Sequence, residues 1–322
     1  MTARIFIDGE VGTTGLQIRS RLEDRPEFEL LSLPADQRKD PARRAEMLNA
    51  ADLAILCLPD DAARPAVAMI ESPDVRVIDA STAHRTSEGW VYGFPEYDAE
   101  QGRRIAEAKR VANPGCYAIA SVAILHPLVA AGIVPTDWPV TINALSGYTG
   151  GGRNLIENFE NPDTADSIDS AFLVYALDLE QKHVPEIQRL GPLEHRPLFV
   201  PSVGRFRQGM IVQIPLQLWS LPGRPAPGDV YAVLSEHYAG CAFVTVADPA
   251  KTAEMKHLDP EDLNGTNELR LHVFGNEEQG QAMIAGLLDN LGKGASGQAV
   301  QNLNLMCGLD ETAGLGQAPM FP

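Results

Sequence analysis

The segment RIFIDGEVGTTGLQIRSRL, residues 4–22, decides the fold of this chain. Its apolar start, Arg4–Ile7, predicts a buried strand, and Leu16–Leu22 has the spacing of a helix. Glycines in the GxxGxxG loop between them let the backbone approach a pyrophosphate at the helix N-terminus. The candidate cofactor contacts of this loop are Gly9, Gly12, Thr13, Thr14 and Gly15. A dinucleotide site is therefore predicted here, although a glycine-rich turn without a ligand has the same spacing.

The alternation of strands and helices continues for about 115 residues. Further strands are predicted at 28–33, 53–58, 75–79 and 111–112, and a crossover helix at 61–70. The apolar run at 53–58 is unbroken, as in strands that are buried on both faces of a parallel sheet. This pattern predicts an α/β domain with a doubly wound parallel sheet of the Rossmann type, which binds its ligand at the carboxyl ends of the strands.

The second predicted strand indicates which dinucleotide is bound. It ends in Ser32-Leu33-Pro34, without the carboxylate that would bind the ribose 2′-hydroxyl of NAD. A basic cluster follows instead, and guanidinium groups suit a 2′-phosphate; the cluster contains Arg38, Lys39, Arg43 and Arg44. We therefore predict NADP, with Arg38 as a contact. A solvated helix face would have the same composition.

The sequence NPGCY, residues 113–117, marks a second turn of chemical interest. Pro114 and Gly115 form a tight turn before a helical pattern at 116–131, so Cys116 lies at a helix N-terminus. Unpaired backbone N–H groups and the helix dipole favour the thiolate there, lowering a pKa of roughly 8.5 in free cysteine. Cys116 is therefore a candidate nucleophile, and a buried structural cysteine is the alternative.

The second half of the chain has a different pattern. Strands are predicted at 140–145, 196–201, 209–218, 242–246 and 268–274, with one helix at 229–238. This indicates an inserted α+β substrate domain with a mostly antiparallel sheet. We expect a cofactor domain of residues 1–115 and 293–322 and a catalytic domain of residues 116–292. The first includes a returning helix at 294–305 and a loose tail at 308–322.

Composition excludes several classes of partner. Forty-three acidic and 26 basic residues give a formal net charge of −17, which disfavours nucleic acids and anionic membranes. No segment approaches the roughly 18 apolar residues of a membrane span, and we expect a cytoplasmic protein.

The four cysteines show neither CxxC nor Cys/His spacing, so we expect no metal site and no disulfide. An antiparallel sheet covered on one face also predicts a homo-oligomer, a dimer or tetramer.

Seven motifs together resemble one family. In chain order they are GxxGxxG, DASTAHR (79–85), YGFPE (92–96), NPGCY (113–117), SGYTGGGR (146–153), KHVPEI (182–187) and QNLNLMCGLDETAGL (301–315). This order resembles the N-acetyl-gamma-glutamyl-phosphate reductases of arginine biosynthesis, particularly their shorter form, through nearly the whole chain. NPGCY followed by HxPEI is the specific part of the resemblance. One departure is that Asp8 and Glu10 place acidic groups beside the expected pyrophosphate.

The resemblance implies a reaction and a set of residues. The acyl group of an acyl phosphate would pass to Cys116, NADPH would reduce the thioester to a semialdehyde, and His183 would supply and remove protons. Gly147 and the Cys116 N–H are expected to stabilise the oxyanion. The resemblance adds Ser81 and Asn302 to the cofactor contacts. The expected substrate-binding residues are Arg85, Ser146, Gly147, Glu186 and Arg207, and further arginine candidates are Arg153 and Arg205.

Three alternatives remain open at this point. The chain could be a related semialdehyde dehydrogenase of the aspartate type, which has the same mechanism. It could act on an acyl phosphate that is bound to a carrier protein. It could also be an NADP-sensing binding protein without catalytic activity, although a sensor needs neither Cys116 nor His183.

Overall fold

The computed structural model describes residues 2–316 of the 322. These residues form two compact units, which are described separately. The first contains the described residues up to Pro95, residues 99–115 and residues 295–316. The second contains Glu96–Asp98 and Cys116–Gly294.

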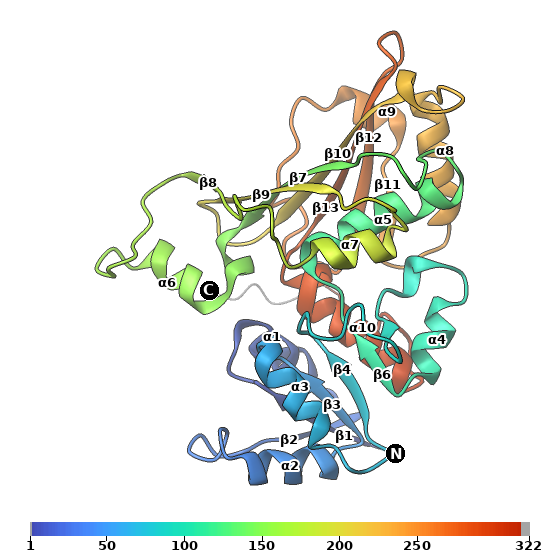
Figure 1. Cartoon of the computed structure of the whole chain (residues 1–322). Coiled ribbons are helices and arrows are strands. Elements are labelled where there is room, and N and C mark those ends of the chain that lie inside the picture. The colour runs from blue at the N-terminus through green and yellow to red at the C-terminus, as the bar shows by residue number, and fades with distance from the viewer. Residues whose placement is uncertain (1, 317–322) are drawn as a thin grey trace. The chain divides into compact units, whose positions relative to one another are not determined.

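The first unit is a six-stranded sheet in the order β2-β1-β3-β4-β6-β5, and all its strand pairs are parallel. Its strands are β1 (Ala3–Asp8), β2 (Phe28–Leu31), β3 (Leu53–Leu56), β4 (Arg76–Asp79), β5 (Val91–Tyr92) and β6 (Arg110–Ala112). Its helices are α1 (Thr13–Leu22), α2 (Pro41–Ala50), α3 (Asp60–Ala68), α4 (Gln101–Glu107) and α10 (Gly297–Met306). The predicted parallel Rossmann-type sheet is confirmed (Figure 1).

The start of α2 and the packing of α10 illustrate how this unit is held together. Asp40 caps α2 by accepting hydrogen bonds from Ala42 N and Arg43 N, and Pro41 provides a preset first residue. α10 packs against α1, α4 and β4 (red beside blue and teal in Figure 1).

The chain after α10 is not a loose tail as far as residue 316. Leu315 is buried, and Ala313 O accepts hydrogen bonds from Arg25 and Asn304. Residues 317–322 of the predicted tail lie outside the described residues.

The second unit is a seven-stranded mixed sheet in the order β11-β12-β13-β10-β7-β9-β8. Only the pairs β11/β12 and β7/β9 are parallel, so the prediction of a mostly antiparallel sheet is confirmed. Its strands are β7 (Thr141–Gly147), β8 (Phe172–Val174), β9 (Leu198–Gly204), β10 (Met210–Gln217), β11 (Val244–Val246), β12 (Leu269–Asn276) and β13 (Gln281–Leu288). Its helices are α5 (Cys116–Ala130), α6 (Gly152–Glu160), α7 (Val184–Leu190), α8 (Pro227–His237) and α9 (Pro249–Glu254), followed by a π-helical turn at Gly292–Ser296.

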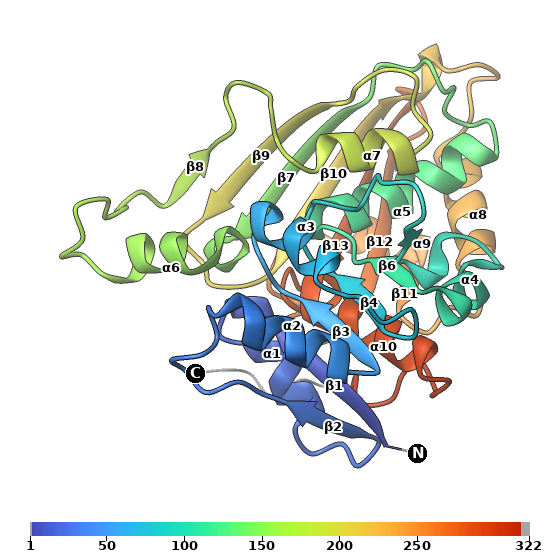
Figure 2. The same cartoon turned by 60° about the horizontal axis from the view of Figure 1, so that its bottom comes forward.

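One helix and one strand make the core of this unit. α5 is buried almost all round and packs on β10 and β13, with α7 and α8 beside it (Figure 2). β13 pairs with both β10 and β12 over its full length, although the sequence analysis did not predict it. A Cβ at Gly286 would approach Ala120 Cβ to 3.3 Å, so this strand uses a small residue where α5 lies close.

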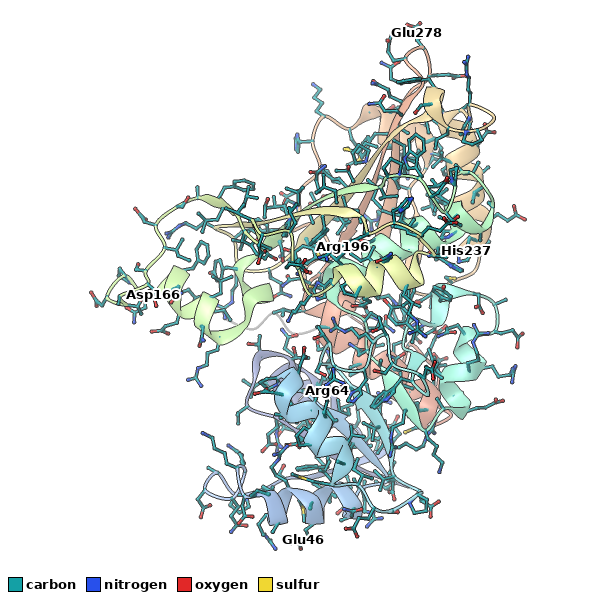
Figure 3. The ribbon with its side chains drawn as sticks, viewed as in Figure 1. Glu46, Arg64, Asp166, Arg196, His237 and Glu278 are labelled. Carbon is teal, nitrogen blue, oxygen red and sulfur yellow. The ribbon has the colours of Figure 1, made fainter. Side chains whose placement is uncertain are left out.

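Much of the acidic excess lies on exposed loops and helix faces. Glu46 on α2, Asp166 after α6 and Glu278 between β12 and β13 are exposed and point outward (Figure 3). Among residues 2–316, no helix combines the length and apolar character that a membrane crossing needs.

Candidate active site

Cys116 is the first residue of α5, as the sequence predicts. The N–H groups of the first turn have no partner within the helix, and the helix dipole adds positive potential at this end. Cys116 lies close to a glycine of the π-helical turn, since a Cβ at Gly294 would lie 2.9 Å from Cys116 Cβ. Glycine is therefore required at this position beside the candidate nucleophile.

Cys116 lines a cavity of about 580 Å³ within the second unit. Three further predicted site residues, Ser146, Gly147 and His183, line the same cavity. Gly150, Gly151 and Lys182 also line it. The structure thus brings both predicted catalytic groups to one cavity.

His183 precedes the first residue of α7 and is buried, with 5 % of its surface exposed. Pro185 stands in the first turn of α7, which explains the HVPE sequence as a helix start. The imidazole lies 5.7 Å, centroid to centroid, from the Tyr117 ring. Its Nδ1 lies 3.3 Å from Gln181 Nε2, and its backbone N–H donates to Gln181 Oε1 at 2.5 Å.

A pair of tyrosines forms part of the cavity wall. Tyr175 donates a hydrogen bond to the Tyr117 hydroxyl (3.0 Å), which donates to Ser202 O (3.3 Å). Burial raises the pKa of Tyr175 to about 12, and it raises the pKa of Tyr117 well above its usual value. Both tyrosines therefore remain protonated near neutral pH and act as hydrogen-bond donors, not as bases.

Cys116 differs from two of the other cysteines in its surroundings. All four cysteines are thiols that form no disulfide. Burial, together with the nearby Asp79 and Asp8 carboxylates, raises the pKa of Cys57 to about 12. Burial also raises the pKa of Cys307. Neither thiol is activated for nucleophilic attack, whereas Cys116 lies at a helix N-terminus.

Gly147 lets two stretches of backbone approach each other beside the cavity. A Cβ at this position would lie 2.6 Å from Gln208 N and 2.7 Å from the Arg207 backbone. Its N–H donates to Gly209 O at 2.9 Å. This N–H already has an acceptor within the chain, and the expected role of Gly147 at the oxyanion stays a prediction.

The other predicted substrate contacts do not line the cavity. Glu186 is buried in the first turn of α7. Arg207 pairs with Glu160 at 2.9 Å, and Arg205 pairs with Asp169 at 3.2 Å. Lys182 of the KHVPEI motif, which was not among the predicted contacts, does line the cavity.

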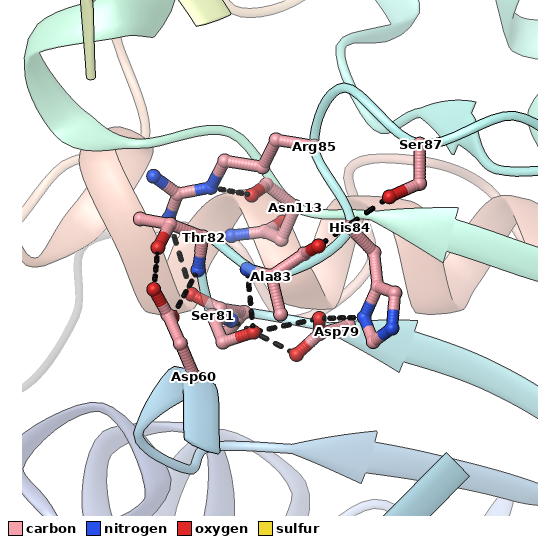
Figure 4. Close-up of polar contacts among 10 residues, drawn as sticks. Asp60, Asp79, Ser81, Thr82, Ala83, His84, Arg85, Ser87 and Asn113 are labelled. Atoms are coloured by element: carbon pink, nitrogen blue, oxygen red, sulfur yellow. Dashed lines mark hydrogen bonds and ion pairs between the residues drawn. The ribbon is translucent and has the colours of Figure 1, made fainter. Parts of the chain in front are cut away.

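Arg85 and Ser81 belong to a loop of the first unit that follows β4 (Figure 4). Asp79 accepts hydrogen bonds from Ser81 N (2.9 Å) and Ser81 Oγ (2.7 Å), and from His84 Nδ1 (2.6 Å). Arg85 donates to Asn113 O at 3.0 Å and Ala80 O at 3.1 Å. The DASTAHR segment is therefore a loop whose conformation is held by Asp79, the last residue of β4.

The glycine loop in the first unit has the tight backbone that the motif predicts. Gly9 has φ +91°, and a Cβ there would lie 2.3 Å from Cys57 O. A Cβ at Gly15 would lie 2.4 Å from Gly9 O, and Gly12 N donates to Gly9 O. Thr13 and Thr14 open α1. A cavity of about 390 Å³ lies beside this loop and is also lined by Glu10, Arg38 and Lys39.

Arg38 belongs to a charge cluster around Glu10. One Glu10 carboxylate oxygen lies 3.1 Å from Arg38 Nη2, and the other lies 2.6 Å from Arg19 Nη1. Ser32 Oγ donates to the same carboxylate at 3.2 Å. Arg38 Nε is buried and has no hydrogen-bond partner among the described residues. The acidic group at Glu10 is evident from the sequence, whereas the cage of cations around it is not.

Asn302, the remaining predicted cofactor contact, is buried in α10. Its amide donates to Gly93 O at 2.9 Å and to Asn113 Oδ1 at 3.0 Å. Asn302 thus joins the YGFPE and NPGCY segments within the first unit.

The chain resembles known proteins over nearly its whole length. Residues 4–105 match the family model "Semialdehyde dehydrogenase, NAD binding domain", and residues 116–290 match "Semialdehyde dehydrogenase, dimerisation domain". N-acetyl-gamma-glutamyl-phosphate reductase 2 of Pseudomonas putida is 54% identical over 95% of this chain and 97% of its own. The reductase of Burkholderia cenocepacia is also 54% identical, over 96% of this chain and 98% of its own.

The chain belongs to the N-acetyl-gamma-glutamyl-phosphate reductase family. The predicted resemblance is thereby confirmed. Solved structures show the same fold at low identity. Aspartate semialdehyde dehydrogenase II of Vibrio cholerae has a TM-score of 0.69 at 15% identity, covering 95% of this chain and 98% of that chain. The Candida albicans aspartate semialdehyde dehydrogenase solved with NADP has a TM-score of 0.66 at 15% identity, with the same coverage of both chains.

Proposed function

We propose that this chain reduces N-acetyl-gamma-glutamyl phosphate with NADPH to N-acetylglutamate 5-semialdehyde and phosphate, in arginine biosynthesis. The observation that carries the proposal is that Cys116, at the start of α5, and His183, at the start of α7, line one cavity. The reductases that are 54% identical over nearly the whole chain name the substrate.

Cys116 acts first. Its thiolate attacks the acyl carbon, the C–O bond to phosphate breaks, and a thioester forms on Cys116 while phosphate leaves with the bond electrons. The N-terminus of α5 favours the thiolate and presents N–H groups that can receive the developing oxyanion. The thioester is a better hydride acceptor than the acyl phosphate.

NADPH, when bound, supplies the hydride that reduces the thioester. The chain's own residues handle the protons that this reduction requires. We propose that His183 gives a proton to the substrate oxygen of the thiohemiacetal and takes it back as the C–S bond breaks. The aldehyde then leaves, and the Cys116 thiolate is restored.

The first unit has features that fit NADP. The glycine loop leaves no room for a Cβ at Gly9 or Gly15, which suits the close approach of a pyrophosphate to the N-terminus of α1. Beside it, Arg19, Ser32 and Arg38 surround an anion, the Glu10 carboxylate. We propose that the 2′-phosphate binds to this cage. We also propose that Gly12, Thr13, Thr14, Ser81 and Asn302 contact the cofactor.

Substrate anions need positive charge in an acidic protein. Lys182 lines the Cys116 cavity, and so do Gly150 and Gly151, which precede α6. We propose that these groups receive the phosphate or carboxylate of the substrate and that Ser146 contributes a hydroxyl. Arg85, Glu186 and Arg207 remain proposed substrate contacts, each with structural contacts of its own.

We further propose a homo-oligomer formed through the second unit, whose matching family model is named a dimerisation domain. β8 is an edge strand, and exposed apolar residues lie on it, on the chain that follows it and at the start of the neighbouring β9. These are Phe172, Val174, Leu177, Leu179 and Leu198, of which Leu177 is 78% exposed. A cytoplasmic location is part of the same proposal, because free thiols and NADPH-dependent biosynthesis suit a reducing compartment.

An assay of substrate choice tests the proposed function. Turnover would be followed in reverse with NADP, phosphate and either N-acetylglutamate semialdehyde or aspartate semialdehyde. We expect activity with the first and little with the second. A preference for aspartate semialdehyde, or turnover that needs a carrier protein, would overturn the assignment of the substrate.

A further inference from the structure

Gln181 contacts His183 at two points through one side-chain amide. Its Oε1 accepts the His183 backbone N–H at 2.5 Å, and its Nε2 lies 3.3 Å from His183 Nδ1. A backbone N–H can only donate, so the oxygen end of the amide must face it. The nitrogen end therefore faces the imidazole, and the orientation of this amide follows from the contacts.

The orientation of the amide determines which imidazole nitrogen carries the proton. An amide nitrogen donates and does not accept, so Nδ1 must present its lone pair to Gln181. In the neutral ring the proton then lies on Nε2. We propose that Gln181 is a positioning residue that holds His183 in the tautomer with the proton on Nε2.

The surroundings of the pair hold this arrangement in place. Gln181 is 8% and His183 is 5% exposed, so the protein covers most of both side chains. Val184 N donates to Gln181 O at 3.0 Å, which closes the turn that carries both side chains. Tyr175, whose hydroxyl donates to Tyr117, lines the same cavity as Gln181 and His183.

The inference deepens the proposed function and rests on it for its catalytic consequence. With Nε2 protonated, His183 enters the reaction as an acid, giving its proton to the substrate oxygen before it acts as a base. The Cys116 thiolate then depends on the N-terminus of α5, not on proton transfer to His183. Gln181 acts through His183 and needs no contact with the reacting atoms.

Gln181→Glu separates this role from a merely structural one. The carboxylate keeps the size of the side chain and still accepts the His183 N–H. Its second oxygen can only accept, so it favours a proton on Nδ1. We expect kcat to fall by at least about 10²-fold, the usual contribution of a positioned acid or base, with KM little changed. Gln188→Glu, on the outer part of α7 where its amide reaches Glu194 O, is the control with the same change of charge.

Nitrogen NMR of the unaltered protein with 15N-labelled histidine tests the inference without an activity measurement. His183 signals would be assigned by their loss in His183→Asn. We expect an unprotonated shift for Nδ1 and a protonated shift for Nε2, with the reverse pattern in Gln181→Glu and no change in Gln188→Glu. A protonated Nδ1, or averaged tautomers, in the unaltered protein would overturn the role of Gln181. That result would leave the proposed function intact, since the substrate assay tests the function separately.

Discussion

Replacing Glu10 with glutamine should tighten the binding of NADPH. In the structure the Glu10 carboxylate occupies the cage formed by Arg19, Ser32 and Arg38, and its side chain is 9% exposed. A 2′-phosphate that binds there must share these cations with the carboxylate or displace it. The phosphate carries roughly −1.5 to −2 charge at pH 7. Removing the carboxylate charge therefore removes a repulsion that NADPH experiences and NADH does not.

The size of the effect follows from the geometry and the exposure of the cage. Unit charges about 6 Å apart interact by roughly 3 kcal/mol at an effective dielectric constant of about 20, and by less than 1 kcal/mol in water. The side chains of Arg19 and Arg38 are 33% and 38% exposed, so an intermediate value of about 1.4 kcal/mol is reasonable. This corresponds to roughly a tenfold lower Kd for NADPH. The gain should diminish as salt screens the cage.

Fluorescence titration of Glu10→Gln with NADPH and with NADH measures this effect directly. Glu29→Gln, an exposed residue of β2 in the same unit, is the control for a change in net charge. We expect the Kd for NADPH to fall only in Glu10→Gln and the Kd for NADH to stay near its original value. An unchanged or weakened NADPH affinity would show that the 2′-phosphate does not bind in this cage.

Three further predictions test other parts of the account. Arg38→Glu should weaken NADPH far more than NADH, and equal weakening of both, measured by the same titration, would remove Arg38 from the 2′-phosphate site. Iodoacetamide at pH 8 should label Cys116 faster than Cys57 or Cys307, whose raised pKa values keep them as thiols, and peptide mapping that finds Cys57 labelled first would contradict this. Leu177→Asp should lower the mass measured by light scattering at micromolar protein, because this exposed side chain borders β8; an unchanged oligomer would place the interface elsewhere, and a monomeric parent protein would refute the oligomer itself.

The sequence predicted the first unit well because its signals are local. The apolar runs and the glycine turn of β1 and α1 depend on neighbouring residues, and Pro114 and Gly115 fix where α5 begins. β13 was missed because Ala282, Ala285 and Gly286 have low strand propensity. Its strand conformation comes from pairing with β10 and β12, which a local pattern does not show.

The candidate site shows the same limit. Motif identity was enough to predict that Cys116 and His183 serve one site, and both line one cavity. Arginine type alone suggested Arg207, but Glu160 already pairs with it, and Lys182 lines the cavity instead. Which partner neutralises a given cation depends on side chains that are distant in sequence. Gln181 and His183 are close in sequence, but the effect of Gln181 on the imidazole tautomer can be inferred only from the directions of their hydrogen bonds.

The central claim is that Cys116 accepts the acyl group. The measurement that tests it most directly is intact-protein mass spectrometry after mixing with N-acetyl-gamma-glutamyl phosphate in the absence of NADPH, followed by peptide mapping. The unaltered protein should gain one acyl group on the peptide that contains Cys116, and Cys116→Ser should gain none while it still binds NADPH. An acyl group on Cys57, Cys241 or Cys307, or near-normal turnover by Cys116→Ser, would contradict the claim.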